Sequence, residues 1–231
     1  MNLPSADALN ARFAEYAPQD IVLAAINEIF PERIALVSSF GTESAVLLHM
    51  VARASRATPV LFIDTLKHFD ETLAYRDRLI DRLRLEDVRI VRPATSDLLG
   101  ADSDGMLWDR DPDACCDLRK TRPLAREIMR FNALFTGRKR HHGNDRVALG
   151  YFEADGVRIK VNPLAHWRAA DVPAYLERHG LPRHPLIEQG YPSVGCAVCT
   201  SRAGAGEDFR AGRWRGRGKS ECGIHKPAGC G

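Results

Sequence analysis

A short stretch near the C-terminus, Glu221 to His225, has the residue types of a reactive thiol site. Cys222 is followed by a glycine, and His225 lies three residues further on. The thiolate form of cysteine is the nucleophile, and nearby positive charge favours it. A basic run precedes the stretch: Arg210, Arg213, Arg215, Arg217 and Lys219. We therefore predict a nucleophilic Cys222 on a flexible, glycine-rich arm, with His225 within reach of it; the alternative is a tail whose cysteine has no role.

Four further cysteines form a second candidate site. Cys115 and Cys116 are adjacent, and Cys196 and Cys199 form a Cys-x-x-Cys pair. Neighbouring side chains on a helix diverge by about 100°, so both thiolates of an adjacent pair would reach one tetrahedral ion poorly. An iron–sulfur cluster, whose irons lie at separate corners, accepts such a pair more easily than zinc does. Disulfides or buried free thiols are the alternatives.

Two basic residues, Arg119 and Lys120, follow the adjacent cysteines within one helical turn. They could donate hydrogen bonds to cluster sulfurs and offset the negative charge of the cluster. The alternative for Lys120 is a position on a solvated helix face.

A polar stretch from Ser38 to Ser44 stands where a predicted strand becomes a helix. Backbone N–H groups and the helix dipole suit an anion there, although the stretch lacks the glycines and the Lys-Ser/Thr pair of a Walker A loop. Asp64 and Thr65 end the next strand at the same sheet edge, where open α/β sheets bind ligands. We expect a nucleotide site that includes Ser38, Ser39, Phe40, Gly41, Asp64 and Thr65; a tight, capped strand–helix turn is the alternative.

The elements that must position these residues alternate between strands and helices. Strands are predicted at 33–39, 59–64, 88–91, 133–136, 148–151 and 157–161, with a turn at 154–156, and helical segments at 5–30, 45–51, 69–83 and 171–179. This alternation predicts an α/β fold with a mostly parallel sheet covered by helices on both faces. Beyond residue 190 the pattern gives way to Pro, Gly and Cys. We therefore predict a nucleotide-binding domain at 1–190 and a C-terminal segment at 191–231 that carries cluster ligands and the nucleophile.

Composition limits the remaining classes. The chain has 231 residues, 45% of them hydrophobic and 27% charged, as in a soluble globular protein. A net charge of +3 is too small to argue for nucleic acid. No apolar run approaches the ~20 residues of a membrane span, and no signal peptide is evident. Six cysteines in such a chain suggest metal or redox chemistry in the cytoplasm rather than structural disulfides. The oligomeric state is left open, a homo-oligomer included.

Together, several stretches resemble the iron–sulfur form of the assimilatory sulfonucleotide reductases, the adenylyl-sulfate (APS) reductases. The resemblance runs from about Ile34 to His225. It is carried by Ser38–Glu43, Phe62–Thr65, Phe69–Thr72, Cys115–Cys116 with Arg119–Lys120 and Pro123–Leu124, Lys160–Leu164, Gly190–Cys199, Gly206–Asp208, Arg210–Trp214 and Glu221–His225.

This resemblance implies an adenine nucleotide α-hydrolase-like fold and the reduction of APS to sulfite and AMP, with thioredoxin or glutaredoxin as electron donor. Cys222 would be the nucleophile and would form an S-sulfonate, and Lys120 would link cluster and substrate. The implied ligands of a 4Fe–4S cluster are Cys115, Cys116, Cys196 and Cys199. The residues implied to line the phosphosulfate pocket are Ser38, Ser39, Arg146, Arg210, Arg213 and His225.

The sequence departs from the family pattern at two places. Asp64-Thr65-Leu66 stands where the family has Asp-Thr-Gly, and Lys139 to Gly143 replaces Arg-Arg-Asp-Gln-Ser. The runner-up is a phosphoadenylyl-sulfate (PAPS) reductase, which shares the Cys222 motif but generally lacks the four cluster cysteines. A more distant alternative is an ATP-dependent RNA-thiolating enzyme that uses residues 213–219 as an RNA-contacting arm. No role is assigned to Cys230.

Overall fold

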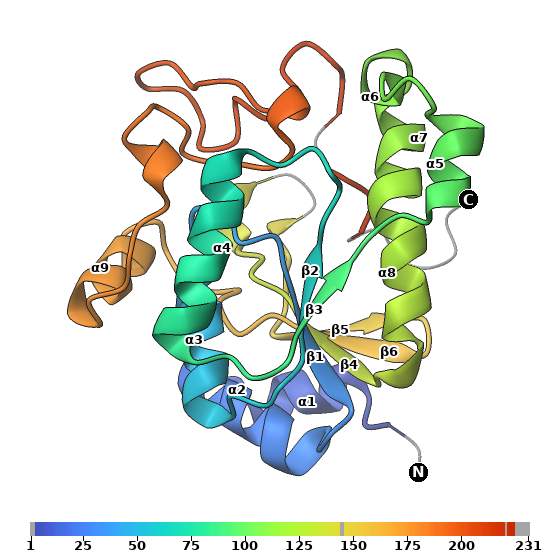
Figure 1. Ribbon diagram of the computed structural model, residues 1–231. Helices are drawn as coiled ribbons and strands as arrows, with labels where there is room; N and C mark the ends of the chain where they lie inside the picture. Colours follow the sequence, from blue (N-terminus) through green and yellow to red (C-terminus); the bar gives the residue numbers. More distant parts are fainter. Residues whose placement is uncertain (1–2, 144–145, 220, 225–231) are drawn as a thin grey trace.

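A computed structural model of the chain describes residues 3–143, 146–219 and 221–224. Its centre is a six-stranded sheet in the order β3-β2-β1-β4-β6-β5 (Figure 1). The strands are β1 (Ile34–Ser38), β2 (Val60–Ile63), β3 (Val88–Val91), β4 (Ala133–Phe135), β5 (Phe152–Asp155) and β6 (Arg158–Val161). All neighbouring pairs are parallel except β5 with β6, so the predicted mostly parallel sheet is confirmed.

One strand prediction is wrong. The apolar run at 148–151 was expected to be a strand, but β5 begins only at Phe152. Leu149 and Tyr151 are buried in the core without belonging to the sheet, because burial alone gives an apolar pattern. Asp155 pairs with Arg158 across a two-residue hairpin loop, and Gly156 takes the positive φ of 61° that such tight turns need.

The helices are α1 (Ala6–Arg12), α2 (Pro18–Ala24), α3 (Ser44–Ala54), α4 (Asp70–Leu83), α5 (Thr95–Ala101), α6 (Leu107–Arg110), α7 (Pro112–Cys116), α8 (Arg122–Glu127) and α9 (Asp171–Arg178). π-helical turns η1 (Ala25–Ile29) and η2 (Asp117–Thr121) extend α2 and join α7 to α8. Short 3-10 turns are η3 (Ile128–Arg130), η4 (Arg140–His142), η6 (Pro185–Ile187) and η7 (Ala197–Cys199). Within the described residues, no helix combines the length and apolar character needed to cross a membrane.

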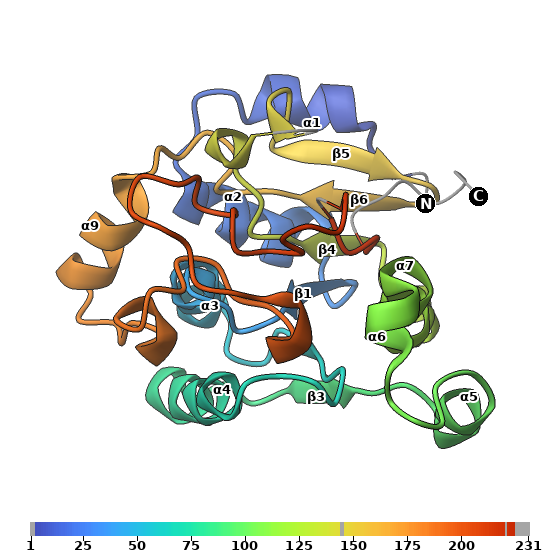
Figure 2. The same ribbon diagram turned by 90° about the horizontal axis from the view of Figure 1, so that it is seen from above.

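Helices cover both faces of the sheet, as predicted (Figure 2). Alternate residues of each strand point to opposite faces. In β1, Ile34 and Leu36 therefore join the large core beneath α2, α3, α4 and α9, while Ala35 joins the smaller core beneath α8. Burial on both faces explains why these strands look continuously apolar in sequence.

The chain order creates a switch point between β1 and β4. From β1 the chain runs through β2 to the edge strand β3, then crosses the other face and returns as β4 on the far side of β1. The loops that follow β1 and β4 therefore leave the sheet in opposite directions. In open α/β sheets ligands bind in the crevice formed at that point.

The C-terminal segment lies over this same edge (Figure 1). Thr42 Oγ1 donates to the carbonyl of Pro192 at 2.7 Å, and Ala197 N–H donates to the carbonyl of Lys67 at 2.7 Å. Residues far apart in sequence are thereby fixed above the carboxyl ends of the parallel strands.

We predict that Leu66→Gly raises stability. Leu66 has a φ of 59° and is 51% exposed, so its Cβ strains the backbone without contributing a buried side chain. A left-handed conformation costs a non-glycine residue about 1–2 kcal/mol, and the entropy of an unfolded glycine offsets about half of that. The thermal midpoint measured by calorimetry should rise by about 1–4 °C. Leu66→Ala is the control, since it keeps the Cβ; equal midpoints for the two variants would contradict the strain.

Candidate active site

A cavity of about 190 Å³ opens at the switch point between β1 and β4. Its walls come from the loop after β1, the loop after β4 and the C-terminal segment. The sequence-predicted residues that line it are Ser38, Ser39, Gly41, Arg146, Arg210 and Arg213. The structure thus brings together residues from three distant stretches of the chain.

The loop after β1 presents its two serines and its glycine to the cavity but not its aromatic ring. Phe40 N–H donates to Ser38 Oγ at 3.1 Å, and Phe40 has a φ of 49°. This turn directs the Phe40 ring into the core, where it lies edge-on to Phe62 with centroids 5.5 Å apart. Phe40 therefore shapes the loop from behind, while Ser38, Ser39 and Gly41 face the cavity.

Three arginines give the cavity its positive charge. Arg146 and Arg210 both contact the carboxylate of Glu221, Arg210 at 3.5 Å. Arg213 donates to the carbonyl of Val194 at 2.9 Å and lies 4.5 Å from the centroid of Trp214. Its buried Nε has no hydrogen-bond partner within the described part of the chain. An anion in the cavity would satisfy that donor.

The loop after β4 supplies residues that the sequence analysis did not assign. Arg138, Lys139 and His142 line the cavity, as does Glu43 from the loop after β1. Lys139 Nζ lies 2.8 Å from a Glu43 oxygen. Burial would raise the pKa of Glu43, but His142 and Lys139 outweigh it and lower that pKa to about 2, so Glu43 is ionised. Arg138, Lys139 and Glu43 follow closely after the ends of β4 and β1, and this position in the sequence could have indicated a role at the ligand-binding edge of the sheet.

Glu43, His141 and His142 also place their ligand atoms within 4.8 Å of one another, as a metal site would. The ammonium of Lys139 already neutralises Glu43, and Arg146 Nη1 lies 3.1 Å from His142 Nδ1. Burial lowers the pKa of both Lys139 and His142. Two cationic side chains at these ligand atoms disfavour a metal cation there.

The four predicted ligand cysteines gather beside the cavity. Cys115 and Cys116 are the last two residues of α7. Cys196 directly precedes η7, and Cys199 is its last residue. Three of them are buried and Cys199 is half-buried. Burial raises the pKa of Cys115 to about 11. Burial also raises that of Cys196, but Lys120, Thr65 and Arg213 outweigh it and lower the pKa.

The spacing of these sulfurs bears on what they could hold. A single zinc ion with tetrahedral bonds of about 2.3 Å requires sulfurs about 3.8 Å apart. Within the described residues, no three cysteine sulfurs lie within 4.8 Å of one another. The four thiols are compatible with a larger group that has separate metal corners.

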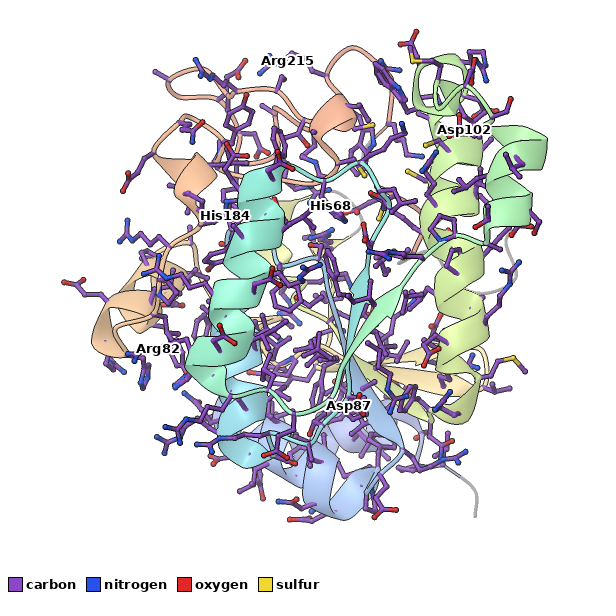
Figure 3. The ribbon with its side chains drawn as sticks, viewed as in Figure 1. His68, Arg82, Asp87, Asp102, His184 and Arg215 are labelled. Carbon is purple, nitrogen blue, oxygen red and sulfur yellow. The ribbon has the colours of Figure 1, made fainter. Side chains whose placement is uncertain are left out.

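Asp64 and Thr65 lie on the cysteine side and not on the cavity wall. Asp64 accepts hydrogen bonds from Leu66 N–H at 3.0 Å and Arg92 at 2.9 Å. Thr65 Oγ1 lies 3.2 Å from Cys196 Sγ, and its carbonyl accepts from Arg119 at 2.9 Å. Arg119 in turn forms a buried ion pair with Asp102, whose position beside the cysteine-bearing helix appears in Figure 3. These contacts fix the cysteine group relative to β2.

Lys120 lies close enough to Cys116, Cys196 and Cys222 for their charges to interact. Burial would lower its pKa, but the charges of Cys196, Cys222 and Cys116 outweigh burial and raise it. Lys120 is half-buried and has several cysteine sulfurs near it, so it does not lie on a fully solvated helix face.

Cys222 is half-buried, and Ile224 two residues later lines the cavity. Two cationic side chains, Lys120 and Arg210, lie close enough to Cys222 for an electrostatic interaction with it. His225 and Cys230 lie outside the described residues, so their predicted roles stay predictions.

Part of the basic run before Cys222 forms ion pairs with carboxylates, whereas the sequence suggested that it supplies positive charge to Cys222. Arg215 pairs with Glu207 at 2.6 Å, Arg217 with Asp109 at 2.9 Å, and Lys219 with Asp113. Arg217 and Lys219 thus fasten the segment to α6 and α7. Figure 3 shows Arg215 on the outer side of this segment.

Comparisons with known proteins agree with this arrangement. Residues 33–202 match the phosphoadenosine phosphosulfate reductase domain, so the chain belongs to the APS/PAPS reductase family. Adenosine 5'-phosphosulfate reductases from Mesorhizobium japonicum and Chelativorans sp. are 48% and 47% identical to it. Each alignment covers 95% of this chain, and 87% and 90% of the respective relatives. The protein is therefore an enzyme, an oxidoreductase acting on sulfur.

Solved structures confirm the fold. A phosphoadenylyl-sulfate reductase from Candida auris, solved as a phosphate complex, matches with a TM-score of 0.74 and 27% identity, over 88% of this chain and 99% of that one. An FMN adenylyltransferase from Candida glabrata matches with a TM-score of 0.55 at 17% identity, over 84% and 64%. The second likeness concerns the fold alone, and the predicted adenine nucleotide α-hydrolase-like fold is confirmed.

We predict that Gly195→Ala weakens anion binding in the cavity. A Cβ at residue 195 would overlap the guanidinium of Arg213 and push it from its place. Bound phosphate stabilises a folded protein in proportion to its affinity. The rise in thermal midpoint on adding phosphate should therefore be smaller in Gly195→Ala than in the unaltered protein. Gly204→Ala, where a Cβ meets only ordinary contacts of 3.4 Å or more, should keep the full rise. An undiminished rise in Gly195→Ala would argue against Arg213 as an anion ligand.

Proposed function

We propose that the protein reduces adenosine 5'-phosphosulfate to sulfite and AMP through a sulfonate on Cys222, with thioredoxin or glutaredoxin as electron donor. The observation that carries the proposal is the convergence of the four cysteines, Lys120 and the half-buried Cys222 beside a cavity lined by three arginines. The printed activity of the two relatives named above supports the choice of substrate.

The cavity suits an anionic nucleotide. Arg146, Arg210 and Arg213 are preorganised by contacts with Glu221, Val194 and Trp214. Arginine binds phosphate and sulfate oxygens through several parallel N–H groups. We propose that these three arginines, with Ser38, Ser39 and the backbone of Phe40 and Gly41, hold the phosphosulfate. Asp64 and Thr65, which we first assigned to the substrate, support the cavity indirectly by fixing β2 against the cysteine group.

The transfer step balances without a proton donor. The Cys222 thiolate forms a bond to the substrate sulfur, and the bond from sulfur to the bridging phosphate oxygen breaks, so AMP leaves with that electron pair. The arginines stabilise the charge that develops on the leaving phosphate. A thiolate of the donor then attacks the Cys222 sulfur and sulfite leaves. The second donor thiol resolves the mixed disulfide, so the dithiol supplies both electrons.

We propose that Cys115, Cys116, Cys196 and Cys199 hold a 4Fe–4S cluster. Three of these cysteines are buried, and the nearby ammonium of Lys120 suits a negatively charged group, which supports this assignment. When bound, the cluster would supply an extended negative charge that orients the Lys120 ammonium. Lys120 itself would direct its charge toward the substrate anion. Free thiols of this kind belong to a reducing compartment, which favours the cytoplasm.

We predict that the purified enzyme, kept anaerobic, releases sulfite from APS when reduced thioredoxin is present. Without thioredoxin, APS should leave one sulfonate adduct on Cys222, located by peptide mass spectrometry. Cys222→Ser should abolish both adduct and turnover, because serine at neutral pH lacks the thiolate. Cys230→Ser is the control and should keep both. A sulfonate on Cys230 would overturn the choice of nucleophile, and a strong preference for PAPS would favour the runner-up substrate.

We predict that Lys120→Ala slows sulfonate formation while iron content is retained. Loss of a charged hydrogen bond in a buried site is worth about 1.5–3 kcal/mol, or about 10- to 150-fold in rate. The rate is measured in single turnover with APS, and iron is measured on the same sample. Cys199→Ser is the comparison variant, which should lose iron. An unchanged rate in Lys120→Ala would remove this residue from the reaction, and an iron-free unaltered protein would remove the cluster.

A further inference from the structure

The cavity already contains an anion that belongs to the chain itself. The carboxylate of Glu221 contacts Arg146 through one oxygen and Arg210 through the other. All three side chains are 15% exposed or less. Removing a charge from water in this way requires a close partner of opposite sign. The Arg146–Arg210 site is therefore built for an anion, and Glu221 fills it.

Glu221 is also the residue next to the nucleophile. Upstream, Arg217 and Lys219 fasten the segment to α6 and α7, and downstream Ile224 packs against the core beneath α8. The Glu221 carboxylate is thus the polar anchor that fixes the backbone immediately before Cys222. Its release would leave Cys222 between the remaining contacts of Lys219 upstream and Ile224 downstream.

The same two arginines line the cavity that we assign to the phosphosulfate. The Glu221 carboxylate and a substrate anion would compete for these two guanidinium groups, since like charges at such distances repel each other in a buried site. We propose that Glu221 is a positioning residue that docks the Cys222 segment by filling the Arg146–Arg210 site, and that an anionic nucleotide displaces its carboxylate on binding. The identity of the nucleotide rests on the proposed function; the docking by Glu221 does not.

This exchange gives the site a simple order of events. Before substrate enters, Glu221 neutralises the arginines and holds Cys222 beside Lys120. When the substrate anion takes the arginines, the Glu221 contact is lost, and Cys222 can approach the sulfur while Lys219 and Ile224 still hold the segment on either side of it. Binding of nucleotide and docking of the segment are then negatively coupled, and the coupling is reciprocal.

The test measures hydrogen exchange of peptides spanning residues 217–224, together with the dissociation constant of AMP. In the unaltered holoenzyme, saturating AMP should raise the exchange rate of this segment, and inorganic sulfate should do so at higher concentration, with chloride at equal ionic strength as the blank. In Glu221→Gln the exchange should be fast without ligand and respond little to it. AMP should bind Glu221→Gln about fivefold more tightly or better, since its competitor is gone.

Two control variants test whether the effect of Glu221→Gln comes from the loss of its contact with the arginines or merely from the loss of one negative charge. Glu43→Gln removes a carboxylate from the same cavity that pairs with Lys139, so it should leave the segment's exchange as in the unaltered protein. Glu207→Gln removes an exposed carboxylate that pairs with Arg215, so it should change neither exchange nor AMP affinity. The proposal is overturned if Glu221→Gln exchanges as slowly as the unaltered protein or binds AMP more weakly. It is also overturned if neither anion speeds exchange. Loss of APS-dependent sulfite release with the coupling intact would count against the proposed function alone.

Discussion

The positive charge of the half-buried Lys120 is the constraint around which the site is arranged. A charge removed from water is tolerated only when partners of opposite sign surround it. The sulfurs of Cys116, Cys196 and Cys222 raise its pKa despite burial. They come from α7, from the start of η7 and from the C-terminal segment. The helix, the Cys-x-x-Cys turn and the segment must therefore converge on one point at the edge of the sheet.

The surrounding contacts make that convergence rigid. Arg119 joins Asp102 in a buried ion pair and also binds the carbonyl of Thr65, whose hydroxyl touches Cys196. Breaking one partner of such a pair leaves an uncompensated buried charge, which costs about 3–5 kcal/mol. The chain from Asp102 to Cys196 thus ties three elements into one support. This support fixes the cysteine group against the end of β2.

Ion pairs balance the positive charge on the two sides of the cavity, the side of Lys139 and the side of Arg146 and Arg210. Around the cavity, Lys139 is paired with Glu43 and Arg138 with Glu153, while Arg146 and Arg210 share Glu221. These pairs keep the cations in place at low electrostatic cost. The shared carboxylate of Glu221 leaves the arginine side richer in positive charge than the Lys139 side. An incoming dianion is therefore drawn toward Arg146, Arg210 and Arg213, close to Cys222.

Local chemistry in the sequence was enough to predict the fold class and to select many of the residues that the structure brings together around the cavity. The apolar strand runs, interrupted by helical periodicity, predicted the parallel sheet, because such strands are buried on both faces. The Cys115–Cys116 and Cys196–Cys199 spacing predicted a shared group, because thiols at those positions have few other uses. Leu149 and Tyr151 misled the strand assignment, because burial outside the sheet produces the same pattern.

The sequence by itself determined which side chains are the candidates for the chemistry: five cysteines, a lysine and a set of arginines. Only the tertiary structure decided their partners. The sequence predicted that Arg215, Arg217 and Lys219 place positive charge near Cys222. In the structure they form ion pairs with Glu207, Asp109 and Asp113, respectively. In the sequence Glu221 was only one residue of the motif around Cys222, but in the structure its carboxylate contacts Arg146 and Arg210. Charges act over a few ångströms in space, and distance along the chain does not specify which opposite charge folding brings within that range.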